Sequence, residues 1–218
     1  MNCHNNWSHL VKTLALSQLH KDLIIGCGLG DATFNMNPNG NASIGFDQGL
    51  PNKEYLLYLF NIMKEYATQP QIGERISFDK RYDKKNFSYN FRTKASTTFF
   101  PFANLFLKKQ KDSTKYVKIV PPCIEELLTP GALAFWLQDD GQHVKNGGVT
   151  LCTDNYTYDD VQLLKSVLEN KYKFKCTIHN KNPNKGYFRI YISGKSLHIL
   201  QPLVVDYFHQ SMLYKIHL

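Results

Sequence analysis

Two stretches of sequence decide the fold: residues 24–32 read IIGCGLGDA, and residues 133–141 read LAFWLQDDG. Each stretch is apolar and places a carboxylate in its eighth position, Asp31 in the first and Asp140 in the second. An apolar run of this kind predicts a buried helix, and the glycines of the first stretch would let that helix approach a partner closely. We therefore expect two helices that pack together and bring Asp31 and Asp140 to one end.

The position of these acids predicts a metal site. A carboxylate at the C-terminal end of a helix is disfavoured by the negative end of the helix dipole, so two such acids suggest that a cation binds there, with Mg²⁺ as the cofactor and Mn²⁺ as a substitute. Taken alone, Asp31 and Asp140 could each be turn residues. Their recurrence at corresponding places favours the metal site. We extend this prediction to Gly30 and Asp139, which directly precede the two acids.

The elements around the two stretches recur in the same order. In the first half, periodicity predicts a helix over 20–31, strands over 32–37 and 42–48, a helix over 52–66, strands over 74–79 and 87–92, and a short helix over 97–107. In the second half it predicts a helix over 130–139, strand signals around 144–152, a helix over 157–170, strands over 173–180 and 186–192, and a last helix capped by Ser193 before a basic tail. The sequence therefore predicts an α+β protein of two pseudo-symmetric α-β-β-α-β-β-α halves.

The boundary between the halves is expected in the Lys-rich and Pro-containing stretch 108–122, which is typical of a linker on the surface. We divide the chain into residues 1–118, the first half with its linker, and residues 119–218, the second half.

The predicted strands alternate between apolar and polar residues, so each antiparallel sheet has one face on a core and one face in solvent. In the first half the core side is expected to comprise Ile76, Phe78, Phe87, Tyr89 and Phe91. The outward residues offer donors, acceptors and cations but few acids, which suits the DNA major groove. The predicted DNA-contacting residues are Thr33, Asn35, Asn37, Arg75, Ser77, Ser88, Asn90 and Arg92 in the first half and Lys173, Lys175, Thr177, His179, Lys185, Tyr187, Arg189 and Tyr191 in the second. The alternative is an ordinary solvated sheet face.

Composition supports a folded, basic protein. The 218 residues are 43% hydrophobic and 20% charged, and the net charge of +8 is typical of a surface that faces nucleic acid or an anionic membrane, although it could also serve solubility alone. Five widely spaced cysteines without a CxxC pair favour a reducing compartment over disulfides or zinc. The sequence contains no long apolar run and no secretory or transit pattern, so we expect a soluble protein that does not enter a membrane.

The two decisive stretches resemble the LAGLIDADG motifs of homing endonucleases. Residues 128–130, LTP, followed by residues 133–141, resemble the second motif of the single-chain members encoded in organellar introns. The resemblance implies a monomer in a mitochondrion or chloroplast that binds a long asymmetric site on double-stranded DNA. It also implies that water activated by a divalent metal cuts both strands and leaves short 3′ overhangs with 5′-phosphates.

The same resemblance implies a lysine near the cut in each half. Lys118, within KIVP, and Lys215, within MLYKI, stand in matching contexts. A lysine there could polarise the attacking water or stabilise charge on the phosphate. Residues at predicted strand ends are expected to support the acids, and these are Asp47, Gln48, Thr153 and Asp154.

Two other functions stay open on this scaffold. Some members of the family are RNA maturases that help an intron fold and splice, so intron RNA is a possible partner. A binding module that does not cut DNA is the other alternative, and it would be expected to lose an acid or a lysine. Because Asp31, Asp140, Lys118 and Lys215 are all present, the sequence favours cutting.

Overall fold

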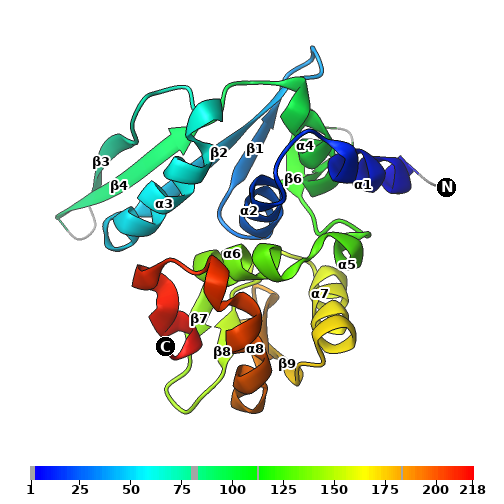
Figure 1. Cartoon of the computed structure of the whole chain (residues 1–218), viewed down its shortest axis with the longest axis vertical. Helices are drawn as coiled ribbons and strands as arrows, with labels where there is room; N and C mark the ends of the chain where they lie inside the picture. The colour runs from blue at the N-terminus through cyan, green and yellow to red at the C-terminus, as the bar shows by residue number, and fades with distance from the viewer. Residues whose placement is uncertain (1–2, 80–82, 112, 183) are drawn as a thin grey trace.

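The chain folds into two halves built from the same series of helices and strands (Figure 1). The computed structural model describes residues 3–79, 83–111, 113–182 and 184–218. The first half comprises α2 (Gln18–Leu29), β1 (Thr33–Met36), β2 (Ala42–Gly49), α3 (Lys53–Met63), β3 (Gly73–Asp79), β4 (Lys84–Arg92) and α4 (Phe100–Phe106). The second comprises α6 (Pro130–Asp140), β7 (Gly141–His143), β8 (Val149–Leu151), α7 (Tyr158–Tyr172), β9 (Cys176–Asn182), β10 (Tyr187–Ile192) and α8 (Leu197–Val204). The predicted α-β-β-α-β-β-α order is confirmed in both halves.

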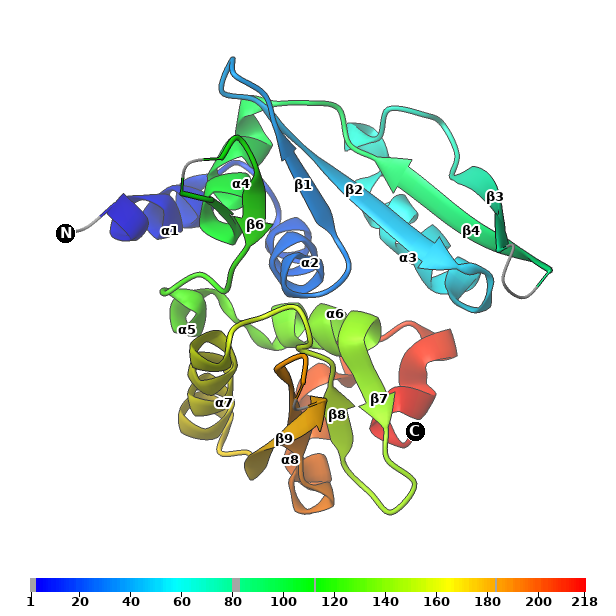
Figure 2. The same cartoon turned by 180° about the vertical axis from the view of Figure 1, so that it is seen from behind.

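Each half contains a four-stranded antiparallel sheet with the same topology. The strand order is β1-β2-β4-β3 in the first half and β7-β8-β10-β9 in the second, so each strand has an equivalent in the other sheet. Figure 2 shows both sheets in front of α3 and α8, which means that the helix-free faces point to the same side of the molecule. A duplicated fold has therefore produced two polar sheet faces that one long ligand could contact together.

Helices α2 and α6 form the contact between the halves. Ser17 caps α2 and Thr129 caps α6, each accepting a hydrogen bond from a backbone N–H of the first turn. The two helices are buried on almost every side because each lies between its own half and the other helix. A Cβ atom on Gly26 would lie 2.3 Å from the carbonyl oxygen of Ala132, so glycine is what allows this close approach.

Several shorter elements complete the chain. They are α1 (Cys3–Thr13), η1 (Leu50–Asn52), η2 (Lys64–Tyr66), η3 (Thr97–Phe99), β5 (Leu107–Lys109), β6 (Tyr116–Lys118), α5 (Ile124–Leu127), η4 (Gly194–Ser196), η5 (Val205–Tyr207) and η6 (Gln210–Ile216), where η marks a 3₁₀ helix. Within the described residues, no helix has the length and apolar character that crossing a membrane requires.

The prediction that Ile76, Phe78 and Phe87 face the core is wrong. Their exposed fractions are 60%, 53% and 37%. The β3–β4 pairing continues outward to the register pair of residues 79 and 84, and Figure 1 shows the end of this hairpin projecting past α3. Tyr89 and Phe91, nearer the middle of the sheet, are buried as predicted because α3 covers that part of β4.

Two predicted strand boundaries in the second half are also wrong. Strand signals were expected around 144–152, but β7 lies before this range, at Gly141–His143, and only β8, at Val149–Leu151, lies within it. The residues between the two strands form a turn in which Gly147 and Gly148 have φ values of 99° and 85°. Lys173 has a φ of 59° and caps α7, so β9 begins at Cys176. The predicted start of α7 is confirmed, because Thr157 and Asp160 form a capping box.

The stretch between the halves is more ordered than a surface linker. Strands β5 and β6 pair as a hairpin, and the following Val120 and Pro121 are buried. The basic tail forms η6, in which Lys215 is buried. Lys118 and Lys215 both donate to backbone carbonyls at the ends of the central helices, which places them near the predicted acids.

Candidate active site

Asp31 and Asp140 lie at neighbouring ends of α2 and α6. Asp140 is the last residue of α6, whereas Asp31 follows the end of α2 by two residues. The backbone N–H of Asp31 donates to Oδ2 of Asp139 at 3.0 Å, and this bond joins the two helix ends directly. The structure therefore brings together the two acids that the sequence singled out.

Lys118 and Lys215 occupy equivalent places at these helix ends. Lys118, on β6, donates to the carbonyl oxygens of Gly30 and of Ala32, the latter at 3.1 Å. Lys215, in η6, donates to the carbonyl oxygens of Gln138 and of Asp139, the latter at 3.1 Å. An ammonium group at the carbonyl end of a helix interacts favourably with the helix dipole. Each half therefore supplies one acid and one lysine, and each lysine binds the carbonyl oxygen of the residue that precedes its acid.

The site crowds three carboxyl groups, those of Asp31, Asp139 and Asp140, with two lysines. Burial, with help from Asp139 and Asp31, raises the pKa of Asp140 to about 8, and burial together with Asp31 raises the pKa of Asp139 to about 6. Burial lowers the pKa of both Lys118 and Lys215, and the neighbouring acids partly oppose this. Since burial and mutual repulsion disfavour the charged acids, a divalent cation bound between them would favour their charged form.

This set of donors fits Mg²⁺ better than zinc. Among the described residues, no three His, Cys, Asp or Glu side chains are grouped to hold one ion. Mg²⁺ commonly binds through one or two carboxylates and takes its other ligands from water and substrate phosphates. Asp31 and Asp140 meet that requirement.

Of the four residues expected to support the acids, Gln48 contacts one. Its Nε2 donates to Oδ2 of Asp31 at 2.8 Å, and Asn52 in turn donates to Oε1 of Gln48 at 2.8 Å. The other three make their hydrogen bonds elsewhere. Thr153 donates to the carbonyl oxygen of Phe188, Asp154 accepts from Arg189, and Asp47 accepts from Arg75.

Two buried tyrosines belong to the site and were missed by sequence reasoning. Tyr55, in α3, donates to Oδ1 of Asp139 at 2.9 Å, and Tyr156 donates to the carbonyl oxygen of Leu29 at 2.8 Å. Each hydroxyl crosses from one half to the helix end of the other. In the sequence Tyr55 counts only as part of an apolar helix face, although a buried hydroxyl needs a partner.

Comparison with known proteins identifies the family. Residues 21–200 match the profile of the LAGLIDADG DNA endonuclease family. The chain belongs to this family. It is 36% identical to an intron-encoded endonuclease, ai4, of Dictyostelium discoideum over 72% of this chain and 89% of that protein. It is 31% identical to the cytochrome b mRNA maturase bI2 of Saccharomyces cerevisiae over 89% of this chain, which spans 46% of the maturase.

A solved structure confirms the fold. The homing endonuclease I-WcaI, bound to its DNA recognition sequence, superposes with a TM-score of 0.82 at 22% identity and covers 97% of this chain and 91% of that chain. The fold is therefore the LAGLIDADG homing endonuclease fold predicted from the two motifs.

In this LAGLIDADG chain, the first sheet gathers most of its predicted DNA-contacting residues on one face. Thr33, Arg75, Asn90 and Arg92 line a shallow hollow together with Asp47. Asn35, Ser77 and Ser88 follow the same alternation along β1, β3 and β4, whereas Asn37 lies in the turn after β1 and accepts from the backbone N–H of Asn41. The outward face predicted for this sheet is confirmed.

In the second sheet, the predicted DNA-contacting side chains bond to one another and to neighbouring side chains. His179 stacks on Tyr191 with ring centroids 5.6 Å apart, and Thr177 bonds to His179 at 2.9 Å. Arg189 donates through Nε and Nη2 to both oxygens of Asp154 and through Nη1 to Gln142, a residue that the sequence did not single out.

The remaining predicted contacts lie at the margins of this sheet. Lys173 and Lys175 precede β9, so they are not on the strand as expected. Lys185 lies in the β9–β10 turn, with its Nζ 5.7 Å from the ring centroid of Tyr187.

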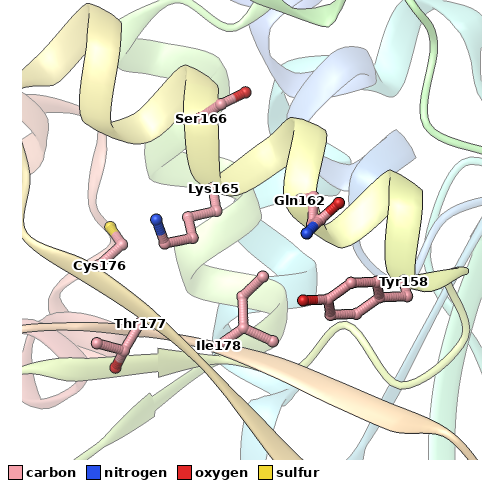
Figure 3. A pocket seen from close by; sticks show the side chains of 7 residues that line it. All are labelled: Tyr158, Gln162, Lys165, Ser166, Cys176, Thr177 and Ile178. Atoms are coloured by element: carbon pink, nitrogen blue, oxygen red, sulfur yellow. The ribbon is translucent and has the colours of Figure 1, made fainter.

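A separate hollow of about 590 Å³ lies between α7 and β9 (Figure 3). Lys165 and Cys176 are part of its lining, and Lys165 donates to Glu169 at 2.7 Å. The lining contains neither Asp31 nor Asp140. This hollow is therefore distinct from the paired helix ends.

Proposed function

We propose that this member of the LAGLIDADG family cuts both strands of a long, asymmetric DNA site with the help of a divalent metal. The observation that carries the proposal is the convergence of Asp31 and Asp140, each with its own buried lysine, at the joined ends of α2 and α6. Two such sets, one from each half, correspond to the two strands of a duplex.

On this proposal, the acids bind the metal and the lysines stabilise negative charge. Asp31 and Asp140 would hold Mg²⁺, or Mn²⁺ in its place, and a metal bound there would supply an activated water and neutralise charge on the phosphate. Lys118 and Lys215 stabilise the extra negative charge that develops on each scissile phosphate. Gly30 and Asp139 contribute through the backbone carbonyls that hold these lysines in place.

The two sheets hold the DNA. Their exposed faces lie on the same side of the molecule, and the complex of I-WcaI with its recognition sequence supports contact with DNA through this fold. Because both halves belong to one chain, residues 1–118 and 119–218, a monomer reads unlike half-sites. The products carry short 3′ overhangs with 5′-phosphates, and the relatives that are cytochrome b mRNA maturases support action in an organelle.

A second function rests on the relatives that are mRNA maturases. The 31% identity to the cytochrome b mRNA maturase bI2 favours intron RNA as an additional or alternative partner. Removal of the acids distinguishes DNA cutting from maturase activity, because cutting needs both carboxylates and RNA binding does not.

The test uses Asp31→Asn and Asp140→Asn, which keep size and most hydrogen bonding but remove ligand charge. Cognate DNA is first selected from a plasmid library with random inserts in Mg²⁺. Gel shifts should show unchanged or tighter DNA binding, while cutting of both strands falls by at least about 100-fold. Asp206→Asn is the matched control, since Asp206 is exposed in η5. If either variant cuts DNA at the parental rate, the acid replaced in that variant is not a metal ligand of the site. If the parent protein promotes splicing and cuts no DNA, the function is that of a maturase instead.

A further inference from the structure

The two catalytic acids are held differently. Asp140 closes α6, and the helix still provides an acceptor for the next residue because Gly141 N–H donates to the Leu137 carbonyl oxygen. Asp31 lies beyond the end of α2. The helix also holds the residue after it, since Ala32 N–H donates to the Cys27 carbonyl oxygen at 2.9 Å, but the N–H of Asp31 itself donates to no carbonyl of α2. The carboxylate of Asp139 supplies that acceptor from the other half, at 3.0 Å.

Both oxygens of the Asp139 side chain are used in this way. Oδ2 accepts from the N–H of Asp31, and Oδ1 accepts from the hydroxyl of Tyr55 at 2.9 Å. Tyr55 is fully buried and comes from α3 of the first half. The Asp139 side chain therefore points across the interface towards α2, and a rigid hydroxyl fixes its orientation.

The opposite helix lacks an equivalent side chain. The residue at the matching position of the first motif is Gly30, and a Cβ atom there would lie 2.5 Å from Oδ2 of Asp139. Gly30 therefore leaves the space that the Asp139 carboxylate fills, and it cannot orient Asp140 in return. The joined helix ends are asymmetric although the fold around them is duplicated.

We propose that Asp139 is a positioning residue that fixes the backbone of Asp31 through a hydrogen bond between the halves, and that the two strands are consequently cut with unequal dependence on it. This inference rests on the proposed cutting of DNA. Asp31 belongs to the first half and Asp140 to the second. If each acid serves one of the two scissile phosphates, as the proposed function implies, an error in the position of Asp31 affects one strand more than the other. Displacement by about 1 Å at a reacting centre can cost about 100-fold in rate.

The test separates the shape of Asp139 from its charge. Asp139→Asn removes the charge, but its amide oxygen can still accept from Asp31 N–H and its amide nitrogen can donate to Tyr55. Asp139→Ala removes both bonds. Rates are measured for each strand of a duplex labelled on both 5′ ends, with the parent and Asp206→Asn as references.

We expect Asp139→Ala to change the ratio of the two strand-cutting rates by at least about tenfold, whereas Asp139→Asn keeps that ratio within about threefold of the parental value. Equal slowing of both strands by Asp139→Ala, or an Asn variant as impaired as the Ala variant, overturns the proposal. If Asp139→Ala fails to fold, Tyr55→Phe provides a second test, because it removes the hydrogen bond that orients the Asp139 carboxylate. Tyr55→Phe should shift the ratio of the two strand-cutting rates in one direction. An unchanged ratio refutes the positioning role of Asp139. A parent that does not cut DNA refutes the proposed function instead.

Discussion

At the scale of single residues, the proposed active site depends on carboxyl groups that the fold keeps close together at a cost in free energy. Asp31, Asp139 and Asp140 come from two helices that end at the same place, and the pKa of Asp140 rises to about 8 because burial and its neighbours disfavour the charged form. The sequence predicted the two acids because a repeated motif marks them. It could not predict the bonds of Asp139 to Asp31 and Tyr55, because those contacts depend on how the two halves dock.

The raised pKa values predict how stability changes with pH. The folded protein holds protons on Asp140 and Asp139 more tightly than the unfolded chain, so this contribution is complete below about pH 4 and is lost as pH rises towards about 8. Urea unfolding without metal should show a fall on the order of 2 kcal/mol between pH 5 and pH 8. Mg²⁺ should offset the loss by binding the charged acids of the folded state.

Asp140→Asn tests the assignment. This variant should lose clearly less stability over the same pH range, because the amide does not ionise, while Asp206→Asn should follow the parent. Stability that is flat or rising from pH 5 to pH 8 in the metal-free parent would contradict the raised pKa of Asp140.

At the scale of helices and strands, the order of elements followed from local sequence, but some burial did not. Period-two alternation located β3 and β4, yet it placed Ile76, Phe78 and Phe87 on the core when the hairpin extends beyond α3. Alternation shows which side chains share a face, whereas the length of the covering helix decides which of them are buried. Lys118 and Lys215 were expected from the family resemblance, but the hairpin of β5 and β6 that carries Lys118 and the 3₁₀ helix that buries Lys215 were not expected.

The contact between α2 and α6 predicts a stability effect at Gly26. A Cβ atom there would lie 2.3 Å from the Ala132 carbonyl oxygen and 2.6 Å from Cβ of Phe135, so the helices would have to separate. Gly26→Ala should lower the free energy of unfolding by about 1 to 3 kcal/mol. Gly49→Ala is the control, because its nearest neighbour would be Cδ of Pro51 at 3.7 Å and its φ is −67°. Equal denaturation midpoints for the two variants would contradict the close packing.

At the scale of the whole molecule, the net charge of +8 and the two sheet faces suit the long anionic ligand that the proposed function requires. On this proposal, lysines at the sheet margins neutralise phosphates and release counterions, so the association constant should fall log-linearly with salt and lose at least about 100-fold between 50 and 200 mM. Lys185→Gln, in the exposed β9–β10 turn, should reduce the slope by about 1 because one phosphate contact is lost. Lys64→Gln should leave the slope unchanged, because Lys64 follows α3 on the helix side.

Filter binding across this salt range measures both slopes. A flat response in the parent would mean that the positive charge serves solubility, and equal slopes in the two variants would mean that the β9–β10 turn does not approach the DNA backbone.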